Sequence, residues 1–355
     1  MEQDINLFTF SSTENHLVQF FDKYSPDNIV IPPDQPLHNF TKRIHRVCRF
    51  CNSPAGAKKF KKVAHIIPEF MGNKYLQSDF ECDDCNSLFS KYETDFAAWL
   101  GIMRTLMGTK GKRGVPTFKS YNDSITARLV DLFNIKATKI SSSTEDNNAI
   151  NVDKDTGRTE ITYSKEPYTP IKVYKSLLKI ALSMIGENEI EQYRFALKYL
   201  QSDSPSDCCD EFAKIMLHYL PMEYRFSKPF GFLFKKNFAV AKLPMHIFML
   251  YFETYIFVLP LPFNKLDCDK GLYNGLEMNF IFPPAILFNK PTLDSLHFSR
   301  NLDFSSHEKI VEEKGLISFY VNPDYLKQGV ILDPETGFST PGTLNADKVV
   351  SVFFD

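Results

Sequence analysis

The chain of 355 residues is about twice the length of a usual single domain, so we expect two domains. Its hydrophobic content of 43% and charged content of 24% are those of an ordinary soluble protein and exclude global disorder. The most apolar stretch, Ile247–Phe263, is interrupted by Glu253 and two prolines, and is too short and too broken for a bilayer span. The first residues carry neither a basic nor an apolar leader region. We therefore expect a soluble, cytoplasmic protein without a membrane partner.

The net charge of −2 conceals an uneven distribution along the chain. Residues 40–120 hold 15 lysines and arginines against 7 aspartates and glutamates, which is a local charge of +8. The remainder of the chain carries −10. A basic segment joined to an acidic remainder is typical of a protein whose contact with nucleic acid is confined to one domain. An unevenly charged solvated surface is the alternative interpretation.

Three segments are expected along the chain. Residues 1–41 form an N-terminal extension that ends in a proline-rich linker, IVIPPDQPLHNF. Residues 42–120 form a small basic domain, and residues 121–355 form a larger acidic domain. Near the start of the larger domain, AINV and TEITY alternate apolar and polar residues on either side of DKDTGR, which predicts a surface hairpin.

The larger domain should combine helices with an aromatic sheet. Apolar residues at helical spacing predict helices over Ile171–Ile185, Asn188–Leu200 and Asp207–Leu220. From Phe226 to Phe304 the chain holds 14 phenylalanines and short β-type runs, FGFLF, HIFMLYFETYIFVL and MNFIF, separated by turn residues. These runs predict a mainly antiparallel sheet that is rich in aromatic residues, so the larger domain is expected to be α+β.

Four of the seven cysteines form two pairs, Cys48-x2-Cys51 and Cys82-x2-Cys85. Cytoplasmic thiols stay reduced, and two thiolates at this spacing can bind one ion from a single turn. Four thiolates complete a tetrahedral shell, so the pattern predicts a structural zinc site without an open position. Redox-active pairs are the alternative, and two such pairs flanking a basic segment argue against it. The remaining cysteines are expected to pack inside the fold: Cys208, Cys209 and Cys268.

Between the two cysteine pairs, His65 is followed by IIPE and then by a Gly-Asn turn. Asn86 follows the last cysteine directly and begins an amphipathic pattern, which predicts a helix that ends near Gly108 and starts opposite the strand bearing His65. The apolar stripe of this helix consists of Leu88, Tyr92, Phe96, Trp99, Met103 and Leu106. The other histidines are expected to be structural: His16, His38, His45, His218, His246, His297 and His307.

The combined motif CRFC…AHIIPEFMGN…CDDCN resembles the HNH endonucleases, in the branch with two zinc-bound CxxC knuckles. The resemblance covers about residues 46–96 and continues less strictly to Ser120. It implies that residues 42–120 form a small zinc-stabilised ββα-metal domain, which holds one catalytic divalent ion, Mg²⁺ or Mn²⁺. By the same resemblance, His65 is the general base that takes a proton from the attacking water, and Asn86 helps to hold the metal.

Two positions depart from the family pattern. The residue before the general base is often Asp, Glu or His and ligates the metal, but here it is Ala64. The middle asparagine of the family has no certain counterpart, because Asn73 lies too early, and Gln77 or Asp79 lies nearer the expected place. The candidates for the second ligand of the catalytic ion are Glu69 and Glu93.

Basic residues around this site have a natural use there. KKFKK at 58–62 and RTLMGTKGKRG at 104–114 suit contacts with phosphates that carry little sequence information, although each lysine alone also fits a solvated loop. The candidate nucleic-acid-binding residues are Lys58, Lys59, Lys61, Lys62, Lys91, Lys110, Lys112 and Arg113.

Taken together, the resemblance implies a metal-dependent HNH endonuclease that hydrolyses phosphodiester bonds of nucleic acid, with DNA as the target and low sequence specificity. HNH domains fused to a larger second domain resemble bacterial antiviral defence effectors, in which that domain senses a ligand, regulates activity or mediates assembly. On this analogy the further partners are a second copy of the chain or a separately encoded sensor. The alternative is a zinc-stabilised nucleic-acid-binding or scaffold protein that catalyses no reaction.

Overall fold

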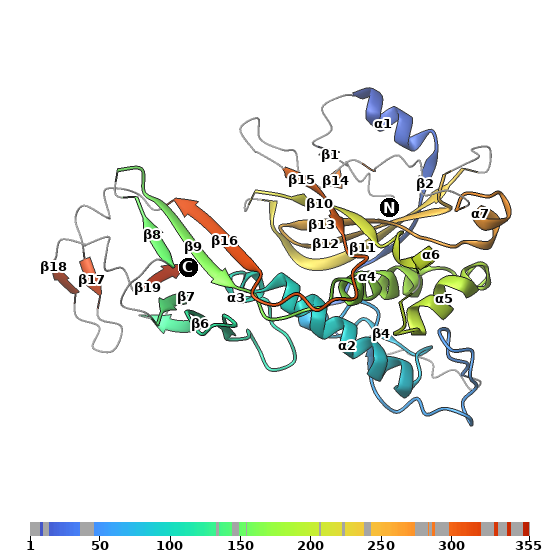
Figure 1. Ribbon diagram of the computed structural model, residues 1–355, viewed down its shortest axis with the longest axis horizontal. Coiled ribbons are helices and arrows are strands. Elements are labelled where there is room, and N and C mark those ends of the chain that lie inside the picture. Colours follow the sequence, from blue (N-terminus) through green and yellow to red (C-terminus); the bar gives the residue numbers. More distant parts are fainter. Residues whose placement is uncertain are drawn as a thin grey trace. The chain divides into compact units, whose positions relative to one another are not determined.

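The structure is a computed structural model of the chain (Figure 1). It describes residues 8–9, 14–35, 46–132, 135–143, 149–153, 155–205, 207–221, 224–237, 243–273, 283, 286–287, 298–320, 330–332, 339–341 and 351–354. The chain divides into two compact units, of which the first comprises Met1–Thr94 and Thr169–Glu308 and the second comprises Asp95–Tyr168 and Lys309–Asp355. The expected domain boundaries after residues 41 and 120 stay predictions.

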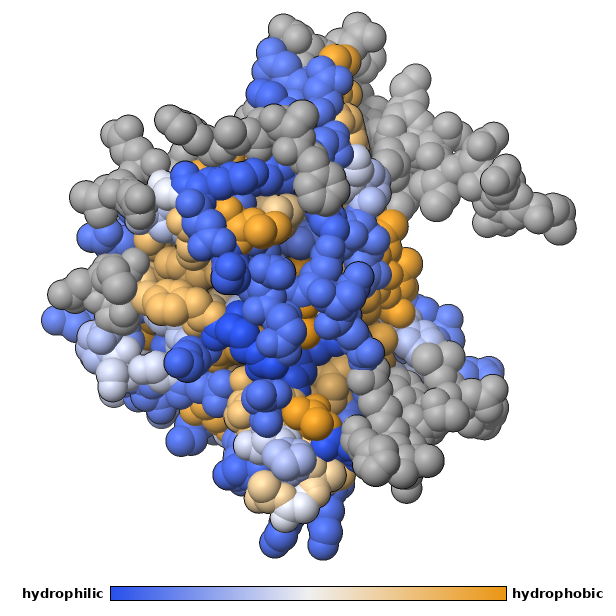
Figure 2. All heavy atoms as spheres, turned by 90° about the vertical axis from the view of Figure 1, so that its right-hand side faces the viewer, coloured by the Kyte–Doolittle hydropathy of each residue, from blue (hydrophilic) through white to orange (hydrophobic). Residues whose placement is uncertain are grey.

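The described residues form helices and antiparallel sheets, which confirms the α+β fold class. None of the helices in this part of the chain is long and apolar enough to cross a membrane. On the face shown in Figure 2, hydrophobic residues lie in separate patches among more numerous hydrophilic ones. Such a mixture is usual for a protein surface in contact with water.

A six-stranded antiparallel sheet forms the centre of the first unit. Its strands follow the order β15-β10-β13-β12-β11-β2, so β2, which comes from the segment expected to be an extension, is one edge of the sheet. All residues of β12 and β13 are buried, and this explains the continuous apolar run in their sequence. The strands are β2 (Tyr24–Val30), β10 (Lys214–Tyr219), β11 (Phe226–Lys236), β12 (His246–Glu253), β13 (Tyr255–Pro260) and β15 (Phe298–Asp303).

Aromatic rings fill the core against this sheet, as its sequence predicts. Phe230 stacks on Tyr251 with ring centroids 4.2 Å apart, and Phe20 stacks on Tyr24 at 5.2 Å. The predicted aromatic antiparallel sheet is thus confirmed, whereas the run MNFIF at 278–282 lies outside the described residues. The shorter elements of this unit are β1 (Phe8–Thr9), α1 (Glu14–Phe21), α6 (Asp207–Asp210), α7 (Lys265–Asp269) and β14 (Ile286–Leu287), of which β1 and β14 pair.

A buried helix, α4 (Pro170–Met184), lies across one face of the sheet and packs against β11 (Figure 1). It begins with a proline, which is well suited to the first helical position, and all its residues except Lys172 are buried. The approach is close at Gly231, where an added Cβ would lie 2.4 Å from the sulfur of Met184. The helix predicted over 171–185 is confirmed. The pattern over 188–200 forms a 3-10 turn, η2 (Ile190–Tyr193), followed by α5 (Arg194–Gln201).

The helix predicted over Asp207–Leu220 is wrong. Only α6 is helical there, and Lys214–Tyr219 is the strand β10. β10 pairs with β13 on one side and with β15 on the other, so its backbone hydrogen bonds are made within the sheet. Ile215 and Leu217 are both buried at strand spacing, and this tertiary pairing outweighs the helical periodicity of the apolar residues.

The second unit contains two small antiparallel sheets and a separate apolar core. One sheet has the order β19-β7-β6-β5 and the other has the order β16-β9-β8. The pairing of β8 with β9 confirms the hairpin predicted around DKDTGR. The strands are β5 (Phe118–Lys119), β6 (Ile125–Leu132), β7 (Ile135–Ser142), β8 (Ile150–Val152), β9 (Arg158–Ser164), β16 (Lys314–Tyr320) and β19 (Ser351–Phe354), together with the pair β17 (Val330–Leu332) and β18 (Ser339–Pro341).

The long amphipathic helix is shorter than predicted. Helix α2 spans Asp83–Leu100, and the rest of the expected helix is a separate short helix, α3 (Met103–Leu106). Gly101 between them has a φ angle of 58°, a left-handed conformation that ends an α-helix and that glycine adopts without strain. The boundary between the two compact units falls within α2, after Thr94.

Candidate functional site

The segment that carries His65 folds as strand, strand and helix. Strand β3 (Ala64–His65) pairs antiparallel with β4 (Gln77–Ser78), and α2 follows. In this register Gln77 lies directly opposite His65, and Ser78 lies opposite Ala64. Ala64 is buried and His65 is partly exposed, so the histidine is accessible from solvent.

The loop between the two strands is closed by Asn73. It follows a 3-10 helix, η1 (Glu69–Met71), which ends at Gly72 in a left-handed conformation with a φ angle of 90°. The amide nitrogen of Asn73 donates to the carbonyls of Ile67 and Leu76, and its amide oxygen accepts from the Leu76 N–H at 2.9 Å. This buried side chain is therefore fully used in holding the loop, which places Gln77, rather than Asn73, beside the histidine.

The four cysteines of the two pairs come together in one cluster. All four sulfurs lie within 4.8 Å of one another, and the Cys48–Cys85 and Cys51–Cys82 sulfur pairs are each 3.7 Å apart. Thiolates at about 2.3 Å from a tetrahedral zinc ion are separated by about 3.8 Å. The cluster therefore has the donor atoms and the spacing that such an ion requires.

Hydrogen bonds within the cluster favour a thiolate at Cys48. Its pKa is lowered to about 5, first by the hydrogen bond with Cys85 and further by main-chain N–H groups, including that of Cys82 at 3.4 Å. The thiolate is the form that binds metals. The first knuckle is closed by Asn52, which adopts a φ angle of 58° and donates its N–H to the carbonyl of Cys48.

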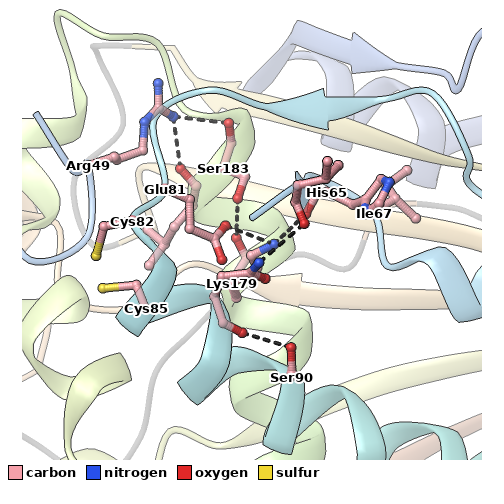
Figure 3. A network of polar contacts seen from close by, with 12 residues as sticks. Arg49, His65, Ile67, Glu81, Cys82, Cys85, Ser90, Lys179 and Ser183 are labelled. Atoms are coloured by element: carbon pink, nitrogen blue, oxygen red, sulfur yellow. Dashed lines mark hydrogen bonds and ion pairs between the residues drawn. The ribbon is translucent and has the colours of Figure 1, made fainter. Parts of the chain in front are cut away.

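A buried lysine from α4 reaches this region (Figure 3). The ammonium of Lys179 donates to the main-chain carbonyl of His65 and forms an ion pair with Glu81 at 3.3 Å. The two side chains are only 2% and 0% exposed. Burial raises the pKa of Glu81, and the charge of Lys179 opposes that shift. Because Glu81 directly precedes Cys82, the ammonium of Lys179 stabilises both the second cysteine pair and the strand that bears His65.

Arg49, inside the first cysteine pair, makes a second connection to α4. Its guanidinium donates to the carbonyls of Leu182, Ser183 and Ile185 at 3.2, 3.0 and 2.8 Å. These are carbonyls at the C-terminal end of the helix, where a positive charge is favourable. The guanidinium also lies 4.0 Å from the centroid of the Phe80 ring.

The candidate ligands of a catalytic ion come from three places: Asn86 from the first turns of α2, Glu93 from the middle of that helix and Glu69 from η1. Asn86, in the first turns of the helix, donates its amide nitrogen to the carbonyl of Val63 at 3.2 Å, which fastens the helix to the strand of His65 and leaves the amide oxygen available to a cation. Burial raises the pKa of Glu93 to about 7, Lys179 opposes the shift, and Glu81 and Glu69 add to it. Glu69 and Glu93 therefore share one electrostatic environment, and amide and carboxylate oxygens suit Mg²⁺ or Mn²⁺.

The lysines at 58–62 are held over the start of α2. Lys58 forms an ion pair with Asp84 at 2.6 Å, and Lys62 donates to the hydroxyl of Ser87 at 2.8 Å. The Asp83 carboxylate accepts the main-chain N–H groups of residues 61 and 62. The candidate nucleic-acid-binding residues are all exposed, but they belong to different units: Lys58, Lys59, Lys61, Lys62 and Lys91 to the first, and Lys110, Lys112 and Arg113 to the second.

The predictions for the remaining histidines and cysteines are confirmed only in part. His218 bonds to the hydroxyl of Ser299 at 2.8 Å, and His307 bonds to the carboxylate of Asp210 at 2.9 Å, both structural contacts. Cys209 is buried as predicted, but Cys268 is exposed, because it lies on the short surface helix α7. His38, His45 and His297, and the side chains of His16 and Cys208, lie outside the described part of the chain.

Comparison with known families agrees with this geometry. Residues 48–96 match the family model described as HNH endonuclease, which confirms the resemblance, and the rest of the chain is unassigned. No match was found among curated proteins or among solved structures. An HNH endonuclease segment indicates nuclease activity on nucleic acid. Lys179 and Glu81 were missed by the sequence analysis, because a buried ion pair between distant segments leaves no local pattern.

Proposed function

We propose that the HNH endonuclease segment makes this protein a metal-dependent endonuclease, which hydrolyses phosphodiester bonds of DNA with little sequence preference. The match over residues 48–96 carries the proposal. The strand–strand–helix order, with His65 on the first strand and Asn86 on the helix, supports it.

In this proposal the four cysteines hold a structural zinc ion. Four thiolates fill a tetrahedral shell, so the ion has no position for substrate, and its role is to stabilise the segment. The sulfur separations of 3.7 Å support this assignment. The zinc then fixes the start of α2 relative to the strand of His65.

His65 is the proposed general base. Its side chain is partly exposed, so water can reach it, while its carbonyl is held by the ammonium of Lys179. An imidazole can accept a proton from water near neutral pH, and it acts on the proton that leaves in the transition state. The strand and the lysine hold the main chain of the histidine in place during this transfer.

Asn86 is the proposed ligand for the catalytic Mg²⁺ or Mn²⁺ ion, together with Glu69 or Glu93. When bound, the ion would offset the negative charge that develops on the phosphate oxygens. Ala64 cannot serve as a ligand. Asp83 and Asp84 at the start of α2 are engaged by the segment at residues 58–62, so Glu69 and Glu93 remain the proposed carboxylate ligands. Exposed lysines at 58–62 would contact phosphates, and such contacts carry no base information.

A bacterial defence role, cytoplasmic location and control by the C-terminal part are proposed by analogy with larger HNH fusions. One observation favours a second function, that of a zinc-stabilised nucleic-acid-binding protein without chemistry: a buried alanine, Ala64, stands where the family often has a metal ligand. Cleavage of nucleic acid distinguishes the two functions, because only the first requires it.

The decisive experiment incubates plasmid DNA and an RNA of similar length with the full-length protein and Mg²⁺ or Mn²⁺, with and without chelator. We expect DNA cleavage that is lost with chelator and in His65→Ala, and retained in His307→Gln, a matched histidine variant away from this segment. Zinc content and nucleic-acid affinity should stay near wild type in His65→Ala. Equal cleavage by His65→Ala and wild type would remove His65 from the reaction, and no cleavage by wild type would favour the binding protein.

A further inference from the structure

A histidine, an aspartate and a glutamate from distant segments meet in the first unit. Asp27 lies in β2, His246 begins β12, and Glu189 directly precedes η2. One ligand atom of each lies within 4.8 Å of the others. None of the three belongs to the HNH endonuclease segment at residues 48–96.

Asp27 faces this cluster at an irregularity in the sheet. Along β11, Leu233 pairs with Asn28 and the next residue, Phe234, pairs with Pro26, so Asp27 has no partner in the register. A bulge of this kind redirects a side chain, and bulges are common next to functional sites. Here the carboxylate of Asp27 approaches the ring of His246 to 3.7 Å.

His246 presents an unsatisfied nitrogen to the two carboxylates. Its side chain is 1% exposed, and Nε2 is buried without a hydrogen-bond partner in the described part of the chain. The other ring nitrogen, Nδ1, bonds to the hydroxyl of Tyr193 at 2.7 Å. A buried polar atom without a partner is costly, and a histidine whose second nitrogen is held by a neighbour is the usual arrangement for a metal ligand.

The distances fit a shared cation better than a direct hydrogen bond. Nε2 lies 3.5 Å from the Glu189 carboxylate and 3.7 Å from the Asp27 carboxylate. A hydrogen bond between nitrogen and oxygen would measure about 2.7–3.2 Å. Nitrogen and oxygen ligands at about 2.1 Å from a tetrahedral ion are separated by about 3.4 Å.

We propose that Asp27, Glu189 and His246 form a second metal site, which binds Zn²⁺. One imidazole with two carboxylates is a donor set for zinc, whereas Mg²⁺ and Ca²⁺ prefer oxygen ligands alone. The side chains of Asp27 and Glu189 are 27% and 25% exposed, so the ion enters from solvent and keeps a position for water.

The charges around the cluster are compatible with a bound cation. Lys235 pairs with the Glu189 oxygen that does not face His246, and Lys236 is committed to Asp267 at 2.8 Å. The two carboxylates and Lys235 together keep a net negative charge beside the neutral imidazole. His246 was predicted to be structural, because a lone histidine in a sequence usually is, and its partners here are distant in the chain.

The test uses full-length protein in the His65→Ala, Asn86→Ala background, which removes the proposed nuclease ion from the measurement. After mild chelation that leaves thiolate-bound zinc in place, Zn²⁺ is titrated by calorimetry, and zinc per chain is measured after gel filtration. We expect Asp27→Asn and Glu189→Gln to retain one zinc ion fewer per chain than the background protein, with affinity at least tenfold weaker. Asp34→Asn, which alters an exposed carboxylate paired with Lys228, is the matched control.

His246→Gln should show the same loss as Asp27→Asn, and circular dichroism checks that each variant is folded. His246 is buried, so His246→Gln can fail to fold. In that case the variants of the two partly exposed residues, Asp27→Asn and Glu189→Gln, decide the outcome. Zinc content and affinity equal to the background protein in both Asp27→Asn and Glu189→Gln would overturn the site. A failure of plasmid cleavage would instead concern only the nuclease, because the zinc measurement does not depend on activity.

Discussion

The ammonium of Lys179 donates a hydrogen bond to the main-chain carbonyl of His65, 114 positions earlier in the chain. The same ammonium pairs with Glu81, which is fully buried (Figure 3). A residue outside the HNH endonuclease segment thus supports the strand of the proposed base and the second cysteine pair together.

Lys179→Met should lower the free energy of unfolding by about 3 kcal/mol, because it leaves Glu81 buried without a compensating charge. Urea denaturation followed by circular dichroism measures this change. Lys172→Met, at the one residue of α4 that is not fully buried, is the control and should change stability by less than about 0.5 kcal/mol. Adding Glu81→Gln to Lys179→Met should restore part of the loss. Equal stabilities of Lys179→Met and Lys172→Met would contradict the role of the buried pair.

Cys48→Ser should abolish zinc binding at the cysteine cluster and unfold the segment around it, since the bound ion contributes directly to folding. Elemental analysis and limited proteolysis between residues 48 and 96 measure the two effects. Cys268→Ser is the control, because that thiol is exposed and distant in sequence from the cluster. Native protein that contains no zinc would refute the assignment.

Asn86→Ala should require at least ten times more Mg²⁺ for half-maximal cleavage. Loss of a residue that merely supports a metal ligand already costs about 10- to 100-fold, and loss of a ligand should cost no less. Asn86→Asp keeps an oxygen donor and should cleave at lower Mg²⁺ than Asn86→Ala. Identical Mg²⁺ dependence of Asn86→Ala and wild type would exclude Asn86 as a ligand.

Lys175 should make the free energy of unfolding depend on pH in the alkaline range. Burial lowers the pKa of this lysine, while Asp210, Asp203 and Cys209 oppose the shift; the ammonium donates to the Ser202 carbonyl and lies 4.4 Å from the Tyr199 ring. Between the lowered pKa and the ordinary value of 10.5, the unfolded chain binds more protons than the folded protein. The free energy of unfolding therefore increases as pH rises through this window, because the buried amine becomes neutral before the exposed amine of the unfolded chain does.

The measurement compares free energies of unfolding of wild type and Lys175→Met between pH 8 and pH 10.5. Wild type should gain stability relative to the variant as pH rises. A difference that stays constant, or that changes in the opposite direction, would show that burial does not control the titration of this lysine.

Local patterns predicted the elements whose partners are near in sequence. The paired cysteine spacing indicated the cluster of four cysteines, and the alternation around DKDTGR indicated the hairpin of β8 and β9. The predicted helix over Asp207–Leu220 is wrong, because β10 is determined by pairing with β13 and β15, which follow it by tens of residues.

The charged groups of the interior could not be predicted in the same way. Lys179 and Glu81 look like ordinary surface residues until α4 is packed against the cysteine segment. His246 likewise lies in an apolar run, and nothing in that run indicates Asp27 or Glu189 as neighbours. Sequence periodicity records which face of an element is buried, but not which distant charge meets it there.

The connection of Arg49 and His65 to α4 also determines when the proposed nuclease can assemble during protein synthesis. The carbonyls that accept from Arg49 are synthesised 133 to 136 residues after it, and the Leu200 carbonyl that accepts from Tyr92 is synthesised 108 residues after Tyr92. At about 5–20 residues per second, these intervals last on the order of ten seconds. A chain that stops before Pro170 contains every cysteine of the cluster and His65, yet it lacks α4. A truncated chain of this kind therefore lacks the helix whose carbonyls accept from Arg49 and whose Lys179 donates to His65.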